Sequence, residues 1–177
     1  MLGVPAADQE AHTGHPEALK AVSECVIFVG LPASGKTTFY LRRFASTHTH
    51  ISKDHWPNVS RKDERQAELI RKALSSGAAV VIDNTNPSVA DRAQIIALAR
   101  ELGARVVGYH FTATTREAVG RNRGREGRQR VPDVAIFTKA KRMAVPTVAE
   151  GFDELYRVTI REDGEYDVIR VAAEPSA

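Results

Sequence analysis

The chain has 177 residues, a length that suits one domain with a single sizeable core. No apolar run approaches the roughly 20 residues that a membrane span needs, so we expect no membrane-spanning helix and no membrane partner. The formal net charge of +3 permits a polyanionic partner without arguing for one, and the single cysteine, Cys25, excludes an internal disulfide and fits a reducing cytoplasm.

The N-terminal residues 1–22 are polar and lack the apolar stretch of a secretory signal. We therefore expect a flexible leader there, with one short helical turn over 17–22. One domain is predicted over 23–172, followed by a flexible tail over 173–177.

Hydrophobic patterning predicts strands that alternate with helices. The run 25–29 is apolar throughout, as expected for a strand that is buried on both faces. The other predicted strands lie at 50–52, 79–82, 106–112 and 155–160, with an edge strand at 166–171 joined through the turn at Asp163 and Gly164. The predicted helices lie at 36–45, 62–75, 115–122 and 132–143, and one more runs from the cap at Ser88 to about Leu102. This order predicts an α/β fold with a parallel sheet of about five strands and helices on both faces.

Residues 30–37 read Gly-Leu-Pro-Ala-Ser-Gly-Lys-Thr and lie between the first strand and the first helix. They satisfy the phosphate-binding pattern G-x-x-x-x-G-K-[ST] in its proper context, which predicts a P-loop nucleoside triphosphatase fold and an ATP site. Successive backbone N–H groups in such a loop face one centre, and the helix N-terminus adds partial positive charge. Lys36 is expected to contact the β- and γ-phosphates, and Thr37 is expected to bind Mg²⁺. The predicted phosphate-binding residues are Gly30, Ala33, Ser34, Gly35, Lys36, Thr37 and Thr38.

Asp54 follows the short second strand, at the sheet edge where ligands of open parallel sheets collect. A carboxylate there would accept the proton of an attacking hydroxyl, and Lys53 would hold an acceptor anion. A second interpretation stays open, in which Asp54 only caps the next segment and Lys53 is solvated.

Residues 83–87 read Asp-Asn-Thr-Asn-Pro and end the third strand at the same edge. Asp83 stands where a magnesium-holding acid of this fold would stand, and Asn84 and Thr85 are candidates for binding acceptor or phosphate. The same residue types also form turns by themselves, so a purely structural role stays open, and both roles can hold together.

Five arginines fall within residues 121–130, in a segment too rich in arginine and glycine for a core element. A mobile arginine stabilises the charge that phosphoryl transfer spreads over the equatorial oxygens, so a lid is expected over about 121–134. Arg121, Arg123 and Arg125 are the candidates. A solvated basic loop is the alternative interpretation for any one of them.

Taken together, these pieces resemble the kinase domain of polynucleotide 5′-hydroxyl kinases, over most of the chain. The segments that carry the resemblance are 30–39, 52–54, 82–87, 111–114, 121–126, 131–132 and 146–152. The resemblance implies that Asp54 is the general base for the 5′-hydroxyl and that Arg125 bridges to the donor phosphates. It also implies that Arg121 or Arg123 is a second lid residue and that Asp83 and Asn84 handle the acceptor. The chain departs from the family at Pro57, where an acceptor-phosphate arginine is found in the phage enzyme.

The leading hypothesis is therefore transfer of the ATP γ-phosphate to a 5′-OH nucleic acid end. A small-molecule kinase acting on a nucleoside, sugar acid or antibiotic would use the same loop, base and lid. A nucleotide-binding module without an acceptor would leave Asp54 and the lid unexplained. The sequence favours neither DNA nor RNA and predicts no oligomeric state.

Overall fold

The computed structural model describes residues 23–173. The leader expected over 1–22, with its helical turn, and residues 174–177 of the expected tail lie outside the described residues. Within the described residues, six strands form one sheet in the order β2-β3-β1-β4-β5-β6. Their bounds are β1 (Glu24–Val29), β2 (His48–Ile51), β3 (Ala79–Ile82), β4 (Arg105–Phe111), β5 (Glu154–Ile160) and β6 (Tyr166–Arg170).

The predicted parallel sheet is confirmed, and the edge strand brings the number of strands to six. β1 to β5 are parallel to one another. β6 is antiparallel to β5 and follows the turn at Gly164, whose φ of 80° suits glycine. A two-strand hairpin needs only a short connection, which explains why this last pair reverses direction.

Five α-helices and three single 3₁₀ turns connect the strands of the described chain. The helices are α1 (Lys36–Arg43), α2 (Lys62–Ser75), α3 (Val89–Glu101), α4 (Thr115–Arg123) and α5 (Asp133–Arg142), and the turns are η1 (Lys53–His55), η2 (Gly127–Gln129) and η3 (Val148–Glu150). The expected cap of α3 is confirmed as a capping box in which Ser88 and Asp91 bond reciprocally. The bounds differ from the prediction by two residues at the end of α1, which stops at Arg43, and at the start of β2, which begins at His48, and by at most one residue elsewhere. The extended ψ of Pro132 leaves that residue just outside α5.

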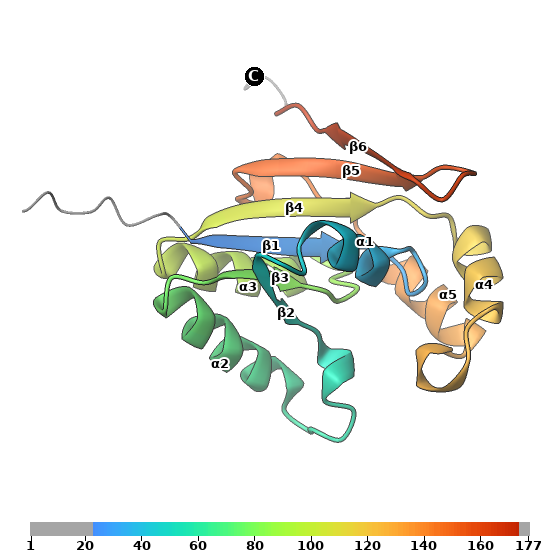
Figure 1. The fold of residues 1–177 in the computed structure, drawn as a ribbon, viewed down its shortest axis with the longest axis horizontal. Helices are drawn as coiled ribbons and strands as arrows, with labels where there is room; N and C mark the ends of the chain where they lie inside the picture. Colours follow the sequence, from blue (N-terminus) through green and yellow to red (C-terminus); the bar gives the residue numbers. More distant parts are fainter. Residues whose placement is uncertain (1–22, 174–177) are drawn as a thin grey trace, which may run out of the picture.

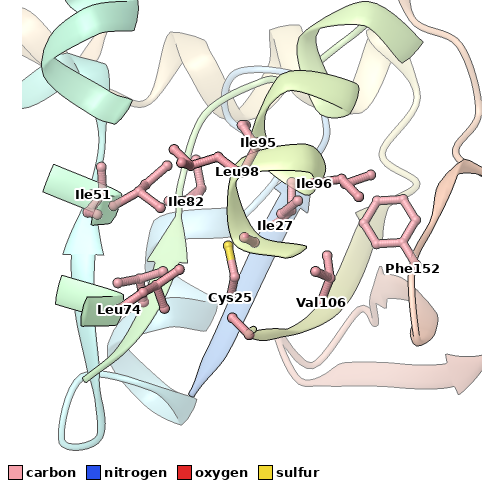
Figure 2. Packing of buried hydrophobic residues seen from close by; sticks show 14 of the residues in the cluster. Cys25, Ile27, Ile51, Leu74, Ile82, Ile95, Ile96, Leu98, Val106 and Phe152 are labelled. Carbon is pink, nitrogen blue, oxygen red and sulfur yellow. The ribbon is translucent and has the colours of Figure 1, made fainter. Parts of the chain in front are cut away.

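Helices cover both faces of the sheet, as the strand–helix alternation predicts (Figure 1). On one face, α2 and α3 pack Ile70 and Ile95 against Ile27 and Ile82 of the central strands, and Figure 2 shows this cluster from close by. On the other face, Phe39 of α1 is 2% exposed, and its ring contacts those of Phe28 and Phe111. Full burial of each such side chain contributes about 1.5–3 kcal/mol.

The carboxyl ends of three neighbouring strands bring distant segments of the chain together. Ile51 of β2 is paired with Ile82 of β3, which is paired with Ile27 of β1. The residues that follow these strands therefore meet at one edge. Figure 1 shows α4 and α5 at the end of the sheet towards which β1 and β4 point. None of the helices within residues 23–173 combines the length and the apolar character required to cross a membrane.

Candidate active site

The loop after β1 has a backbone that larger residues could not follow. Gly35 has φ 93°, and a Cβ atom there would lie 2.5 Å from Cδ1 of Ile160. A Cβ on Gly30 would lie 2.9 Å from both Cβ of Phe111 and Oγ of Ser34. Both positions therefore require glycine, one for its conformation and for space, the other for space alone.

The side chain of Lys36 folds back over this loop and bonds to its backbone. Its Nζ donates to the carbonyl oxygens of Gly30 at 3.0 Å and Leu31 at 2.7 Å, and the residue is only 8% exposed. Burial lowers the pKa of Lys36 to about 8, while the carboxylate of Asp83 acts in the opposite direction and the Arg125 guanidinium adds to the lowering. The loop is thus held in a phosphate-binding shape with a buried cation at its centre.

Thr37 and Asp83 bring two oxygens together at the mouth of the loop. The Thr37 hydroxyl donates to Oδ2 of Asp83 at 2.7 Å, and Nε2 of His50 lies 3.0 Å from the same carboxylate oxygen. Burial alone would raise the pKa of Asp83, but the hydrogen bond to His50, the charge of Lys36 and the Thr37 hydroxyl together lower it. Asp83 is therefore an ionised, oriented carboxylate beside a hydroxyl, a donor set that fits Mg²⁺.

His50 is a residue whose contact with the site the sequence did not reveal. His48 and His50 stand two residues apart, and no cysteine or acid at a useful spacing completes a metal site with them. The sequence therefore predicts that they are surface or core residues. In the fold it stacks on Tyr40 at 4.0 Å between ring centroids and orients Asp83. The parallel pairing of β2 with β3 is the signal that could have found it, because that pairing puts the two strand ends side by side.

Asp54 lies exposed in η1 and lines the cavity above the phosphate loop. Ser52, not Asp54, caps this turn, since its hydroxyl accepts from the Asp54 backbone N–H. Among residues 23–173, no hydrogen bond or ion pair holds the Asp54 carboxylate. Lys53 is ion-paired with Asp63 of α2 rather than simply solvated. An unengaged carboxylate that faces the cavity is available to a substrate hydroxyl.

Two asparagines of the loop 83–87 have structural roles, because they bond to neighbouring segments. Asn84 accepts from the Lys53 backbone N–H at 2.9 Å and donates to Gln66 of α2 at 2.6 Å. Asn86 donates to the Phe28 carbonyl at 2.7 Å and has a positive φ of 44°. The turn interpretation therefore describes both asparagines, while Asn84 and Thr85 also line the cavity. Their contact with an acceptor stays a prediction.

A buried ion pair holds the loop 83–87 in place, and the sequence did not reveal it. Arg92 of α3 is 0% exposed and contacts Glu150 through two hydrogen bonds of 2.6 and 2.8 Å. Its Nη1 donates to the carbonyl oxygens of Asn86 and Pro87 at 3.0 and 3.2 Å. Arginine is rarely buried without partners, so a buried arginine here implies that the loop is held rigidly.

The arginine-rich segment divides between two places. Arg125 lines the cavity and donates to the Gln129 carbonyl at 3.3 Å, and Arg128 lines it as well. Arg121 lies near Tyr166, whose hydroxyl donates to the Gly35 carbonyl, and Arg123 points to Asp133 at 3.9 Å. Arg121 and Arg123 do not line the cavity of this conformation, and the contact of all three arginines with nucleotide stays a prediction.

One cavity of about 1090 Å³ brings most of the predicted residues together. They are Ala33, Gly35, Lys36, Thr37, Thr38, Lys53, Asp54, Asp83, Asn84, Thr85 and Arg125. Gly30 and Ser34 lie behind this lining, where they shape the loop. The cavity therefore brings together an anion-binding loop, the buried carboxylate of Asp83, a cationic wall formed by Arg125 and Arg128, and the exposed carboxylate of Asp54. Such a set can hold a polyphosphate and deprotonate a hydroxyl in front of it.

Comparison with known proteins places most of this chain in one sequence family. The profile of the family AAA_33, described as an AAA domain, matches residues 25–146. A bifunctional polynucleotide phosphatase/kinase of Schizosaccharomyces pombe is 28% identical over 148 residues, which cover 81% of this chain and 35% of the relative. A protein of Acanthamoeba polyphaga mimivirus with a provisional form of the same name is 30% identical over 151 residues, 79% of this chain and 34% of its own length.

The chain thus spans about a third of the length of these two curated relatives. Among solved structures, a fungal RNA kinase has the same fold with a TM-score of 0.61 and 18% identity, over 77% of this chain and 38% of the kinase. At that identity the likeness concerns the fold, a mostly parallel sheet with a phosphate loop after the first strand.

Proposed function

Residues 25–146 make the chain a member of the AAA_33 family of AAA domains, and from that premise we propose that it transfers the terminal phosphate of ATP to the 5′-hydroxyl end of a polynucleotide. The observation that carries the proposal is the cavity that Asp54 and the phosphate loop line together. A nucleotide binder without an acceptor has no use for an exposed, unengaged carboxylate at this position. The names of the two curated relatives support a polynucleotide as the acceptor.

In the proposed reaction, the donor phosphates lie on the loop N–H groups, with Lys36 on the β- and γ-phosphates. Thr37 and Asp83 would hold Mg²⁺, which when bound neutralises charge on the phosphate oxygens. Because Lys36 already crosses the loop, its ammonium moves from two carbonyl oxygens to the phosphates without leaving the site.

Asp54 accepts the proton of the 5′-hydroxyl as that oxygen attacks the γ-phosphorus. The bond between the 5′-oxygen and the γ-phosphorus forms, while the bond from the γ-phosphorus to the β–γ bridging oxygen breaks. ADP leaves with that oxygen, and Asp54 releases its proton to solvent. Arg125, on the cationic wall, stabilises the charge on the transferred group.

The test is ATP-dependent labelling of 5′-OH DNA and RNA oligonucleotides by the wild-type chain and by Asp54→Asn. The variant is expected to lower kcat about 10²–10⁴-fold while ATP affinity stays nearly unchanged, because the lost group handles the acceptor proton. Glu68→Gln is the matched control. This carboxylate lies on α2, is paired with Arg65 at the surface and does not line the cavity.

Absence of label on every DNA and RNA end, in a protein that binds ATP, would refute the proposal. Label on a sugar acid, nucleoside or antibiotic alone would identify a small-molecule kinase instead. ATP hydrolysis that is indifferent to Asp54→Asn would indicate a nucleotide-binding module.

A further inference from the structure

Helix α5 presents two basic side chains to the cavity, and neither has a role in the mechanism above. Lys139 and Arg142 line the cavity, and they stand three residues apart, on one face of the helix. Lys141, between them, is exposed and does not line the cavity. The helix therefore has one cationic face towards the site and an ordinary solvated lysine on another face.

These two cations lack strong acidic partners among residues 23–173. No ion pair or hydrogen bond of that region engages the Lys139 amine. In the described part of the chain, Arg142 is paired with one acid, Asp91 at 4.0 Å, and that carboxylate already accepts from the Ser88 backbone N–H at 3.1 Å and hydroxyl at 2.6 Å.

The position of α5 is fixed beside the loop 83–87. Ile136 is completely buried, and the Ala144 backbone N–H donates to the Pro87 carbonyl at 2.8 Å just after the helix ends. Pro87 belongs to the loop that Arg92 holds from below. Arg142 therefore lies near the end of the loop 83–87, close to the start of α3, and not on a freely moving segment.

We propose that Lys139 and Arg142 bind the phosphate that follows the terminal nucleoside of the acceptor strand. The inference rests on the proposed function, because that phosphate lies one sugar away from a 5′-oxygen placed at Asp54. Among the other cations of the lining outside the phosphate loop, Lys53 is paired with Asp63, and Lys62 and Arg128 belong to two different elements. Helix α5 places two cations on one face of a single element, so it distinguishes a polynucleotide from an uncharged acceptor.

The experiment compares two 5′-OH oligonucleotides that differ only in their first linkage, which is an ordinary phosphodiester or a neutral methylphosphonate. The wild-type chain is expected to have a kcat/KM roughly tenfold or more higher for the charged linkage, and Arg142→Gln is expected to remove most of that preference. The KM for ATP should stay unchanged in Arg142→Gln. Lys139→Gln should reduce the preference as well. Lys141→Gln, on the same helix but outside the cavity, should keep the full preference.

An Arg142→Gln variant that keeps the wild-type preference would overturn the inference, as would a wild-type chain that does not distinguish the two linkages. Both results leave transfer to 5′-OH ends intact, so they are separate from failure of the proposed function. If neither oligonucleotide is labelled, the proposed function fails, and this inference fails with it. Arg142 is largely exposed, and an unchanged melting temperature would show that Arg142→Gln folds normally.

Discussion

At the scale of single residues, Lys36 is the group whose chemistry depends most on its surroundings. Its amine is buried against two loop carbonyls, and burial lowers the pKa of Lys36 to about 8. A lysine in water keeps its proton well above this pH. Lys36 is therefore a cation at neutral pH that can lose its charge within the range of ordinary experiments.

We predict that ATP binds more weakly as the pH rises through about 8, because only the charged amine attracts phosphate. The dissociation constant should rise by up to about tenfold per pH unit above that point. Calorimetric titration with ATP from about pH 7 to about pH 9.5 measures this. Lys36→Arg, which keeps its charge, should bind with an affinity that is flat over the same range. A flat wild-type profile would contradict the prediction.

The lowered pKa of Lys36 has the opposite effect on the stability of the ATP-free protein, which increases rather than decreases with pH. The unfolded chain keeps the Lys36 proton up to its ordinary pKa of 10.5, whereas the folded chain releases it near 8. Between these two values the unfolded state binds more protons, so this group makes the fold more stable as the pH rises.

At the scale of elements, the ion pair between α3 and η3 holds the loop that follows β3. Arg92 is fully buried, Glu150 is nearly so, and the same guanidinium donates to two loop carbonyls. Removing one partner of such a pair leaves a buried charge uncompensated, which costs far more than the pair itself contributes.

We predict that Arg92→Met lowers the free energy of unfolding by about 3–5 kcal/mol, measured by urea denaturation. The double variant Arg92→Met with Glu150→Leu should recover part of this loss, because it leaves no buried charge. Arg65→Met is the surface control: its pair with Glu68 has a similar distance but is exposed, and its loss should cost at most about 1 kcal/mol. Equal effects of the buried and surface variants would contradict this account.

At the scale of the whole molecule, the modest net charge of +3 hides an uneven distribution. Among residues 23–173, seven lysines and arginines and four acids line the cavity. The basic residues are Lys36, Lys53, Lys62, Arg125, Arg128, Lys139 and Arg142, and the acids are Asp54, Asp63, Asp83 and Asp91. A cleft lined by an excess of one sign attracts the opposite charge more strongly than the net charge of the protein suggests.

We predict that the KM for a single-stranded 5′-OH acceptor rises steeply between about 50 mM and about 200 mM salt, because each phosphate contact releases counterions. The slope of log KM against log salt should be about 0.7 for every phosphate contacted. An uncharged small acceptor, tested in parallel, should show no such slope. A KM for the polynucleotide that is independent of salt would contradict the prediction that the cavity binds phosphates of the acceptor.

The sequence by itself determined the layered fold and the phosphate loop. Alternating apolar strands and amphipathic helices specify a parallel sheet, and the glycines of 30–37 specify a loop that few other residues could form. These features are local, because spacing along the chain decides which backbone conformations and which buried faces are available. The bounds of α2 and β3 were predicted to the residue for the same reason.

Only the tertiary structure decided which side chains share the site and what each is bonded to. His50 reaches Asp83 because β2 lies beside β3, and Arg92 reaches Glu150 across 58 positions of sequence. Lys139 and Arg142 join the cavity because α5 is bonded to Pro87, whereas Arg121 and Arg123 of the run 121–130 lie outside its lining. Contacts between segments distant in sequence depend on strand order and helix docking, which no local pattern of residues encodes.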